Sequence, residues 1–220
     1  MDFSRVAFFG DSWVYGSELD NKDKAFPNLL GALNYGVPGT GIPGLLRRFN
    51  EAQKEFDIAV FCLTDPSRLM FYKDYDNYTD DSYGNALLDS EYTTLQKISN
   101  DYNDDVIVSQ VCYILYKWCC DLNIDCFFIN MFTRQLNESY LWKLIPDNKW
   151  LLPPQSHVVK HLFDRQKTLC EFDDMRDHAA WIYNNNSPDV QKFIRPCDRH
   201  PNKLGHKVIA EFISDKLNEI

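Results

Sequence analysis

The sequence predicts an α/β fold in which a mostly parallel sheet carries helices on both faces. Short apolar runs alternate along the chain with longer segments of helical periodicity, the pattern of strand–helix–strand units. The chain has 220 residues, of which 45% are hydrophobic and 25% charged, a balance that suits a globular protein with a core. No internal repeat or low-complexity linker divides it, so we expect one domain over residues 1–220.

Four apolar runs are predicted to be strands because each is short and ends at a glycine or a polar residue. They are Arg5–Phe9, Leu33–Tyr35, Asp57–Leu63 and Ile124–Asn130. We expect the whole sheet to contain about five strands.

Four segments have the spacing of helices: 24–33, 42–56, 104–122 and 204–217. The segment Asp104–Leu122 has the clearest pattern, since its apolar residues recur every three or four positions. Asn202 is expected to cap the last helix, and His206, which lies on that helix, is expected to be structural.

Two connections, 66–103 and 133–195, are longer than ordinary loops, and we expect them to carry local helices and to shape a binding site. The first is acidic and rich in tyrosine between Phe71 and Tyr83, which favours either a rim that stacks on sugars or a solvated loop with packing aromatics. In the second, Trp142, Trp150 and Trp181 either wall a pocket or pack in the core.

The composition excludes several classes of function. The formal net charge is −9 and the basic residues are scattered, so we expect no nucleic-acid partner. No apolar run is long enough to span a membrane, and no secretion signal is visible at the start. We therefore expect no membrane partner and a cytoplasmic protein, with a viral or particle-associated location as the alternative.

The seven cysteines are odd in number and form no Cys-x-x-Cys pair, which favours reduced thiols over a disulfide framework or a zinc site. His157 and His161 are four residues apart but lack the His-Glu-x-x-His pattern, so we expect a surface or core pair and no metal.

Two motifs carry chemistry. Gly10-Asp11-Ser12 directly follows the first predicted strand, where an α/β sheet binds its ligands. Asp198-Arg-His200-Pro-Asn202 lies in a turn before the last helix. A serine nucleophile needs a base that takes its proton and a carboxylate that orients the base, and these two motifs supply all three groups.

These blocks, together with Asn34-Tyr-Gly36-Val-Pro-Gly39 after the second predicted strand, resemble the SGNH (GDSL-type) hydrolases in order and spacing over nearly the whole chain. The resemblance implies a flavodoxin-like three-layer α/β/α sandwich and ester hydrolysis, or acyl transfer, without a metal or other cofactor. It implies Ser12 as the nucleophile, His200 as the general base and Asp198 as the orienting carboxylate.

The same resemblance implies an oxyanion hole built from the N–H groups of Ser12 and Gly39. The sequence departs from the family after the third predicted strand, where Thr64 stands in place of the usual asparagine. Thr64 is a candidate third donor, with Asn130 and then Asn85 as alternatives. Many members also place the aspartate three residues before the histidine, a position held here by Cys197, so a Ser12–His200 dyad is a second possibility.

The function we expect is hydrolysis of a small ester, with an acetyl group on a carbohydrate as the favoured substrate. Candidate substrate-binding residues are Trp13, Asp65, Tyr72 and Tyr75. An acyltransferase with the same triad is one alternative, and a non-catalytic carbohydrate-binding or structural module on the same fold is the other. The sequence carries no signal for an oligomeric state.

Overall fold

A parallel sheet forms the centre of the computed structural model, which describes residues 1–17, 19–52, 55–64, 104–131, 143–153, 158, 193 and 200–220. The described part contains four strands, in the order β2-β1-β3-β4, where about five were expected. Each begins and ends within one residue of its predicted bounds. They are β1 (Val6–Gly10), β2 (Leu33–Gly36), β3 (Ile58–Leu63) and β4 (Asp125–Asn130).

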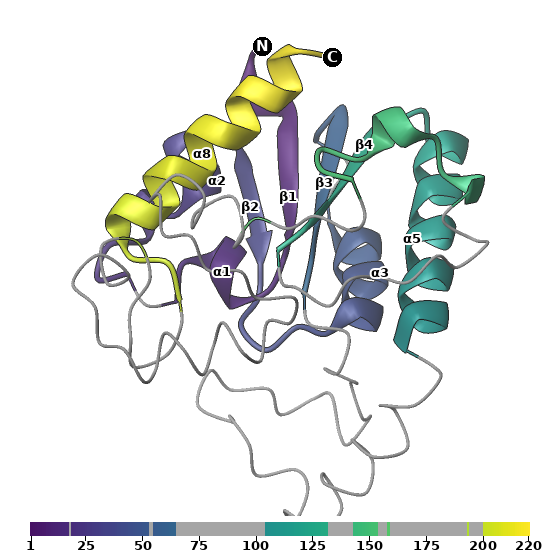
Figure 1. Cartoon of the computed structure of the whole chain (residues 1–220), viewed down its shortest axis with the longest axis horizontal. Coiled ribbons are helices and arrows are strands. Elements are labelled where there is room, and N and C mark those ends of the chain that lie inside the picture. Colours follow the sequence, from purple (N-terminus) through teal and green to yellow (C-terminus); the bar gives the residue numbers. More distant parts are fainter. Residues whose placement is uncertain are drawn as a thin grey trace, which may run out of the picture.

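Strand β1 lies between β2 and β3, and its register aligns the ends of all three strands. Phe8 is opposite Asn34 on β2 and opposite Val60 on β3, and every pairing is parallel. The carboxyl ends of the strands therefore share one edge of the sheet, and the short helix α1 (Ser12–Tyr15) begins at that edge (Figure 1). This is the edge at which sheets of this class bind ligands.

Helices cover both faces of the sheet, as the sequence predicts. Helices α2 (Phe26–Leu29) and α8 (Lys203–Asn218) lie on one face, and α3 (Ile42–Glu51) and α5 (Asp104–Asp121) on the other (Figure 1). Three single turns of 3-10 helix complete the described elements: η1 (Phe3–Arg5), η2 (Lys22–Lys24) and η5 (Asp147–Lys149).

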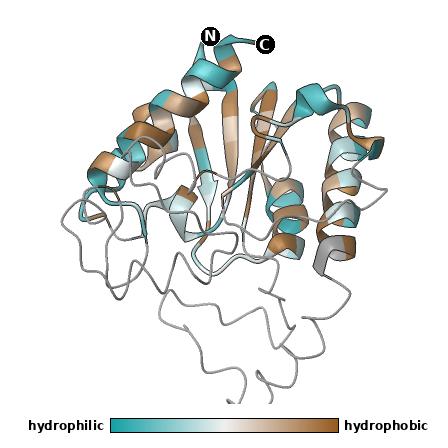
Figure 2. Cartoon of the chain, viewed as in Figure 1, coloured by the Kyte–Doolittle hydropathy of each residue, from teal (hydrophilic) through white to brown (hydrophobic). Residues whose placement is uncertain are grey.

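Alternate residues of β1 pack into two separate hydrophobic cores, one on each face of the sheet. Val6 and Phe8 of β1 pack into the cluster beneath α8, whereas Ala7 and Phe9 pack into the cluster beneath α3 and α5. All four are fully buried. Figure 2 shows β1 and β3 as largely apolar, as expected for strands of a parallel sheet that is covered on both faces.

Two helices are shorter than predicted. The helix expected over 24–33 is only Phe26–Leu29, because Pro27 sits in its first turn and Gly31 follows with a φ of 73°. Helix α3 ends at Glu51, since Ala52 is extended, although Phe56 still packs into the core as expected. The four-residue helix α1 was not predicted, because so short a helix has no periodicity.

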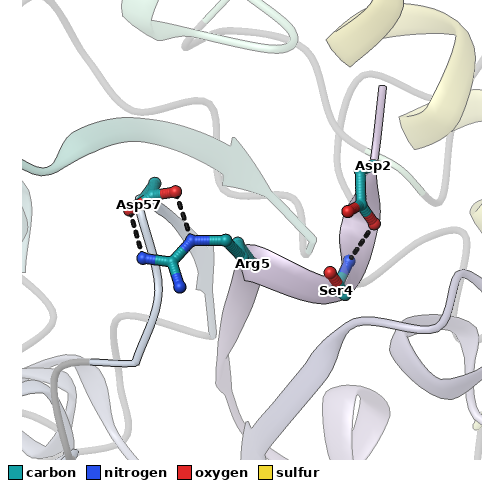
Figure 3. Close-up of polar contacts among 4 residues, drawn as sticks. All are labelled: Asp2, Ser4, Arg5 and Asp57. Carbon is teal, nitrogen blue, oxygen red and sulfur yellow. Dashed lines mark hydrogen bonds and ion pairs between the residues drawn. The ribbon is translucent and has the colours of Figure 1, made fainter.

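The opposite edge of the sheet is polar. Arg5 Nη2 donates to Asp57 Oδ1 at 2.6 Å (Figure 3). The Asp57 N–H donates to the Arg5 carbonyl at 2.9 Å. Asp2 caps η1 by accepting from the Ser4 N–H at 3.0 Å, also seen in Figure 3. The Arg5–Asp57 hydrogen bond lowers the pKa of Asp57. Because both side chains are exposed, this ion pair ties β1 to β3 with little effect on stability.

Five cysteines lie in the described part, and all five are free. Cys62, Cys112, Cys119 and Cys126 are buried, whereas Cys120 is exposed. Burial raises the pKa of the Cys62 and Cys112 thiols, so these two side chains behave as small apolar groups of the core. None of the described helices combines the length and apolar character that a membrane span requires.

Candidate active site

Ser12 is the first residue of α1 and lies directly beyond the carboxyl end of β1. Asp11 caps this helix, since its Oδ1 accepts a hydrogen bond from the Trp13 N–H at 3.0 Å. The chain therefore turns into the helix directly after Gly10. Gly10 itself has no room for a side chain, because a Cβ there would lie 2.3 Å from Val14 Cγ2. The sequence Gly-Asp-Ser thus ends the strand and starts the helix at one point.

His200 reaches Ser12 from the other end of the chain. Its Nε2 lies 2.8 Å from Ser12 Oγ, although the two residues are 188 positions apart. Ser12 is 2% exposed and His200 is half-buried. With its proton on Nδ1, the imidazole accepts the serine hydrogen at Nε2, which is the arrangement that a general base requires.

The segment that carries His200 is held by the start of α8. The Asn202 side chain accepts from the N–H groups of Leu204 and Gly205 at 2.9 and 3.0 Å, as the predicted N-cap. The Asn202 N–H donates to the Phe193 carbonyl at 2.8 Å. A Cβ on Gly205 would lie 2.3 Å from that same carbonyl, so glycine is required for this close approach.

Gly39 lies in a tight turn next to the end of β1. The Thr40 N–H donates to the Val37 carbonyl at 3.1 Å, and Gly39 has a φ of 75°. Proline before a glycine of positive φ is typical of a type II turn. The Val37 N–H donates to the Gly10 carbonyl at 2.9 Å, which ties this turn to the strand that leads to Ser12.

The N–H groups of Ser12 and Gly39 are the two backbone donors that the sequence predicts for an oxyanion hole. Neither N–H has an acceptor among the described residues. Both belong to turns at the carboxyl edge of the sheet, where sheets of this class bind ligands. Their role in catalysis stays a prediction.

Strand β2 fixes α1 from one side. Asn34 Nδ2 donates to the Val14 carbonyl at 2.9 Å, and Asn34 Oδ1 accepts from the Gly36 N–H, also at 2.9 Å. A Cβ on Gly36 would lie 2.3 Å from the Tyr15 nitrogen, so the end of β2 touches the backbone of α1 directly. The block Asn34-Tyr-Gly36 therefore positions the helix that carries Ser12.

Lys22 fixes the far end of the same helix. Its ammonium group donates to the carbonyls of Gly16, Ser17 and Leu19 at 2.9, 2.7 and 3.2 Å. It also lies 5.0 Å from the centre of the Tyr15 ring. A cation at a helix C-terminus is favourable because the last carbonyls there lack partners. Sequence reasoning missed Lys22, because a lone lysine between two loops carries no motif.

Thr64 follows β3 and faces Asp11. Thr64 Oγ1 donates to Asp11 Oδ2 at 2.9 Å, and the two residues are 2% and 1% exposed. The structure thus brings Thr64 next to the serine turn, but its hydroxyl hydrogen is directed at a carboxylate. Asn130, the alternative third donor, is 3% exposed and lies opposite Leu63 at the end of β4.

Trp13, a candidate substrate-binding residue, lies in the core beneath α8 and is 3% exposed. Trp150 is also buried, at 8% exposure, and packs with Phe128 at the α5 face. The remaining predicted site and pocket residues lie outside the described residues. They are Asp198, Asp65, Tyr72, Tyr75, Asn85, Trp142, Trp181, His157 and His161.

His206 is a core residue, as expected from its place on α8. It is 1% exposed, its Nδ1 accepts from the Phe26 N–H at 3.2 Å, and its ring stacks on Phe26. Burial, with smaller contributions from His200 and Lys22, lowers the pKa of His206 to about 4. It therefore stays neutral near pH 7. The described residues hold no group of three or more His, Cys, Asp or Glu side chains placed to bind a metal.

The fold is that of the SGNH (GDSL-type) hydrolases. The structure is similar to a protein from Desulfitobacterium hafniense assigned to the G-D-S-L family of lipolytic proteins, with a TM-score of 0.50 and 12% identity. That similarity covers 97% of this chain and 99% of the other. No protein-family model and no curated protein matches the sequence.

A second similar structure is a two-domain esterase active on acetylated mannans, solved with mannopentaose. Here the TM-score is 0.48 and the identity 14%, over 97% of this chain and 49% of the other. At 12% identity the likeness to the Desulfitobacterium hafniense protein concerns the fold alone.

Proposed function

We propose that this protein is a serine esterase in which Ser12 is the nucleophile and His200 the general base. The observation that carries the proposal is the 2.8 Å separation of Ser12 Oγ and His200 Nε2 at the carboxyl edge of the sheet. Two residues so distant in sequence lie at hydrogen-bond distance. Ser12 is the first residue of α1, and His200 lies two residues before the N-cap of α8. This is the geometry by which a histidine activates a serine hydroxyl.

The first half-reaction forms an acyl-enzyme. Ser12 Oγ attacks the ester carbonyl carbon while its proton passes to His200 Nε2. The carbonyl oxygen then carries the negative charge, and in this mechanism the N–H groups of Ser12 and Gly39 donate to it. When the tetrahedral intermediate collapses, the bond to the alcohol oxygen breaks and His200 returns the proton to that oxygen.

The second half-reaction releases the acyl group. Water attacks the acyl carbon, His200 takes a proton from the water, and the bond to Ser12 Oγ breaks with the proton returning to Ser12. A free carboxylic acid leaves. If an alcohol enters in place of water, the same steps transfer the acyl group, so the acyltransferase is a second outcome of this mechanism.

For the substrate we propose a short acyl ester, with acetyl on a carbohydrate as the first class to test. The support comes from the sequence, in which an acidic segment rich in tyrosine follows β3 between Phe71 and Tyr83. Aromatic rings offer apolar faces on which sugar rings stack, and acidic side chains accept hydrogen bonds from sugar hydroxyls.

Hydrolysis of p-nitrophenyl acetate tests the proposed function. We expect the wild type to turn over this ester, and Ser12→Ala and His200→Ala to lose activity by roughly 10³-fold or more. Ser17→Ala is the matched control and should keep most activity, because Ser17 lies beyond the same helix but does not contact His200. Equal turnover by wild type and Ser12→Ala, in protein shown to be folded, would contradict the proposal.

Two further assays separate the alternatives. Acetate release from acetylated xylan or mannan oligosaccharides, with a long-chain ester beside them, tests the substrate class. An added alcohol acceptor that yields a new ester in preference to free acid would indicate the acyltransferase. No turnover of any ester, together with binding to the sugars, would indicate the non-catalytic module.

A further inference from the structure

Asp11 and Thr64 form a buried bridge between the two central strands at the site. Each residue directly follows its strand, Asp11 after β1 and Thr64 after β3, and these strands are parallel neighbours. Their side chains therefore meet at the same edge of the sheet, where Thr64 Oγ1 donates to Asp11 Oδ2 at 2.9 Å. At 2% and 1% exposure the two residues are shielded from water, which strengthens a hydrogen bond to a carboxylate.

The direction of this hydrogen bond limits what Thr64 can do. A hydroxyl has one hydrogen to donate, and an ionised carboxylate only accepts. The Thr64 hydrogen is used on Asp11 Oδ2, while Asp11 Oδ1 holds the Trp13 N–H at 3.0 Å. The carboxylate thus links the end of β3 to the first turn of the helix that begins with Ser12.

We propose that Thr64 is a positioning residue for Ser12, acting through the Asp11 carboxylate, and that it is not a donor to the oxyanion. This inference rests on the proposed function, because it concerns the placement of the nucleophile. Loss of the Thr64 hydroxyl would let the Asp11 carboxylate turn, and the cap on α1 would loosen. Ser12 Oγ would then leave its 2.8 Å contact with His200 for part of the time.

A double-mutant cycle at positions 11 and 64 separates positioning from oxyanion donation. Thr64→Val removes the hydroxyl at nearly constant volume, and Thr64→Ser keeps it. Asp11→Ala is the partner change, because it removes both carboxylate oxygens; asparagine would not serve, since its NH₂ group could donate to Thr64 Oγ1 and keep the bridge in the reverse direction. In that background the threonine hydroxyl has no carboxylate to donate to.

We expect Thr64→Val to lower kcat for p-nitrophenyl acetate and the rate of Ser12 labelling by a fluorophosphonate by about tenfold, with KM nearly unchanged. Thr64→Ser should stay within about twofold of wild type, because it restores the donor. In the Asp11→Ala background, whose own kcat is lowered by the loss of the cap on α1, Thr64→Val should change kcat by less than about twofold. The same coupling should appear in the free energy of unfolding, measured with Ser12→Ala present throughout.

The results that overturn the inference are equally specific. If Thr64→Val lowers kcat by the same factor in both backgrounds, Thr64 acts directly on the substrate. If Thr64→Val leaves an active wild type unaffected, the bridge does not position Ser12. An inactive, unlabelled wild type would instead contradict the proposed function, and with it any role of Thr64 toward a nucleophile.

Discussion

Gly36 ends β2 and Gly31 precedes it, and the two positions require glycine for different physical reasons. Gly36 has ordinary backbone angles but no space, since a Cβ would lie 2.3 Å from the Tyr15 nitrogen. Gly31 has space around it but a φ of 73°, a backbone angle that residues other than glycine rarely adopt. Only the first of these two positions touches the helix that carries Ser12.

We expect Gly36→Ala to move α1, because the added methyl meets backbone that cannot yield. Stability should fall by about 1–3 kcal/mol, and Ser12 labelling by a fluorophosphonate should slow by more than about tenfold. Gly31→Ala is the control and should lower stability by about 1 kcal/mol with labelling unchanged. Urea unfolding and labelling rates of the two variants check this, and equal labelling rates would contradict it.

The lowered pKa of His206, about 4, predicts how the free energy of unfolding changes with pH. Above pH 6.5 the imidazole is neutral in both states, so its packing is fully retained. As the pH falls from about 6.5 to about 4, only the unfolded chain takes up this proton, and the free energy of unfolding decreases by about 3 kcal/mol. Below about pH 4 both states are protonated and the decrease stops.

His206→Asn tests this linkage, because the asparagine oxygen can replace Nδ1 as the acceptor for the Phe26 N–H. We expect the wild type to be more stable than the variant at pH 7.5, and the difference to shrink by about 3 kcal/mol at pH 4. Urea unfolding at a series of pH values measures it. A difference that stays constant with pH would show that His206 is not held neutral by the fold.

At the scale of elements, α8 connects stability to the placement of His200. Its cap residue, Asn202, is two positions from His200 and holds the N–H groups of Leu204 and Gly205. The opposite face of α8 packs on the sheet through residues such as Val208 and Phe212. The start of α8 is therefore held by its cap and by the packing of the helix. This fixes the point of the chain two residues after His200.

Replacement of Asn202 should change both the stability of the protein and its kcat. We expect Asn202→Ala to lower stability by about 1 kcal/mol and to reduce kcat more than it changes KM, because His200 loses its nearest anchor. Asn202→Asp keeps an oxygen for the two N–H groups and should restore both values to near wild type. Unfolding and steady-state kinetics check it; an Asn202→Ala enzyme with unchanged kcat would mean that other contacts hold His200.

The elements also show what sequence patterns can and cannot predict. All four described strands, α5 and α8 were predicted within one or two residues. The strands are short apolar runs that end at a glycine or a polar residue, and the two helices are long segments with one period. Helix α2 was predicted too long, because the apolar pattern continued past Gly31, whose positive φ no pattern contains. Helix α1 was missed because four residues show no period.

Some residues of the site were predicted from sequence motifs, whereas others were found only in the structure. Ser12, Gly39 and His200 were named from motifs, and the structure places Ser12 beside His200. Asp11 and Asn34 stood in the same motifs, but that they hold α1 through the Trp13 N–H and the Val14 carbonyl is visible only in the structure. The contacts of Lys22 with the carbonyls after α1 leave no sequence pattern. Thr64 was noted as a departure from a family pattern, but its partner Asp11 could only be found in three dimensions.

At the scale of the whole molecule, the strand order places the site at the ends of β1 and β3, the two central strands of the described sheet. Both β1 and β3 have a parallel neighbour on each side, and their side chains feed two separate cores. Ser12 and Thr64 follow these two strands directly. The bridge between Asp11 and Thr64 therefore joins the most enclosed part of the described sheet, which suits a site that must hold its geometry.

This arrangement predicts an order of amide exchange. We expect the amides of β1 and β3 to exchange only through global unfolding, and those of β2, which has one partner strand among the described residues, to exchange faster. Hydrogen–deuterium exchange with peptide-level mass spectrometry measures this at pH 7. Faster exchange in β1 than in β2 would contradict the central position of β1, the strand that leads to Ser12.

Every step of the proposed mechanism requires that Ser12 is an activated nucleophile. A fluorophosphonate forms a bond from phosphorus to the attacking serine oxygen with loss of fluoride, so it reports activation without any assumption about the substrate. We predict one adduct per wild-type molecule, mapped to Ser12 by peptide mass spectrometry, with no adduct in Ser12→Ala or His200→Ala and an unchanged adduct in Ser17→Ala. A folded wild type that forms no adduct, or one that forms it at another serine, would contradict the central claim.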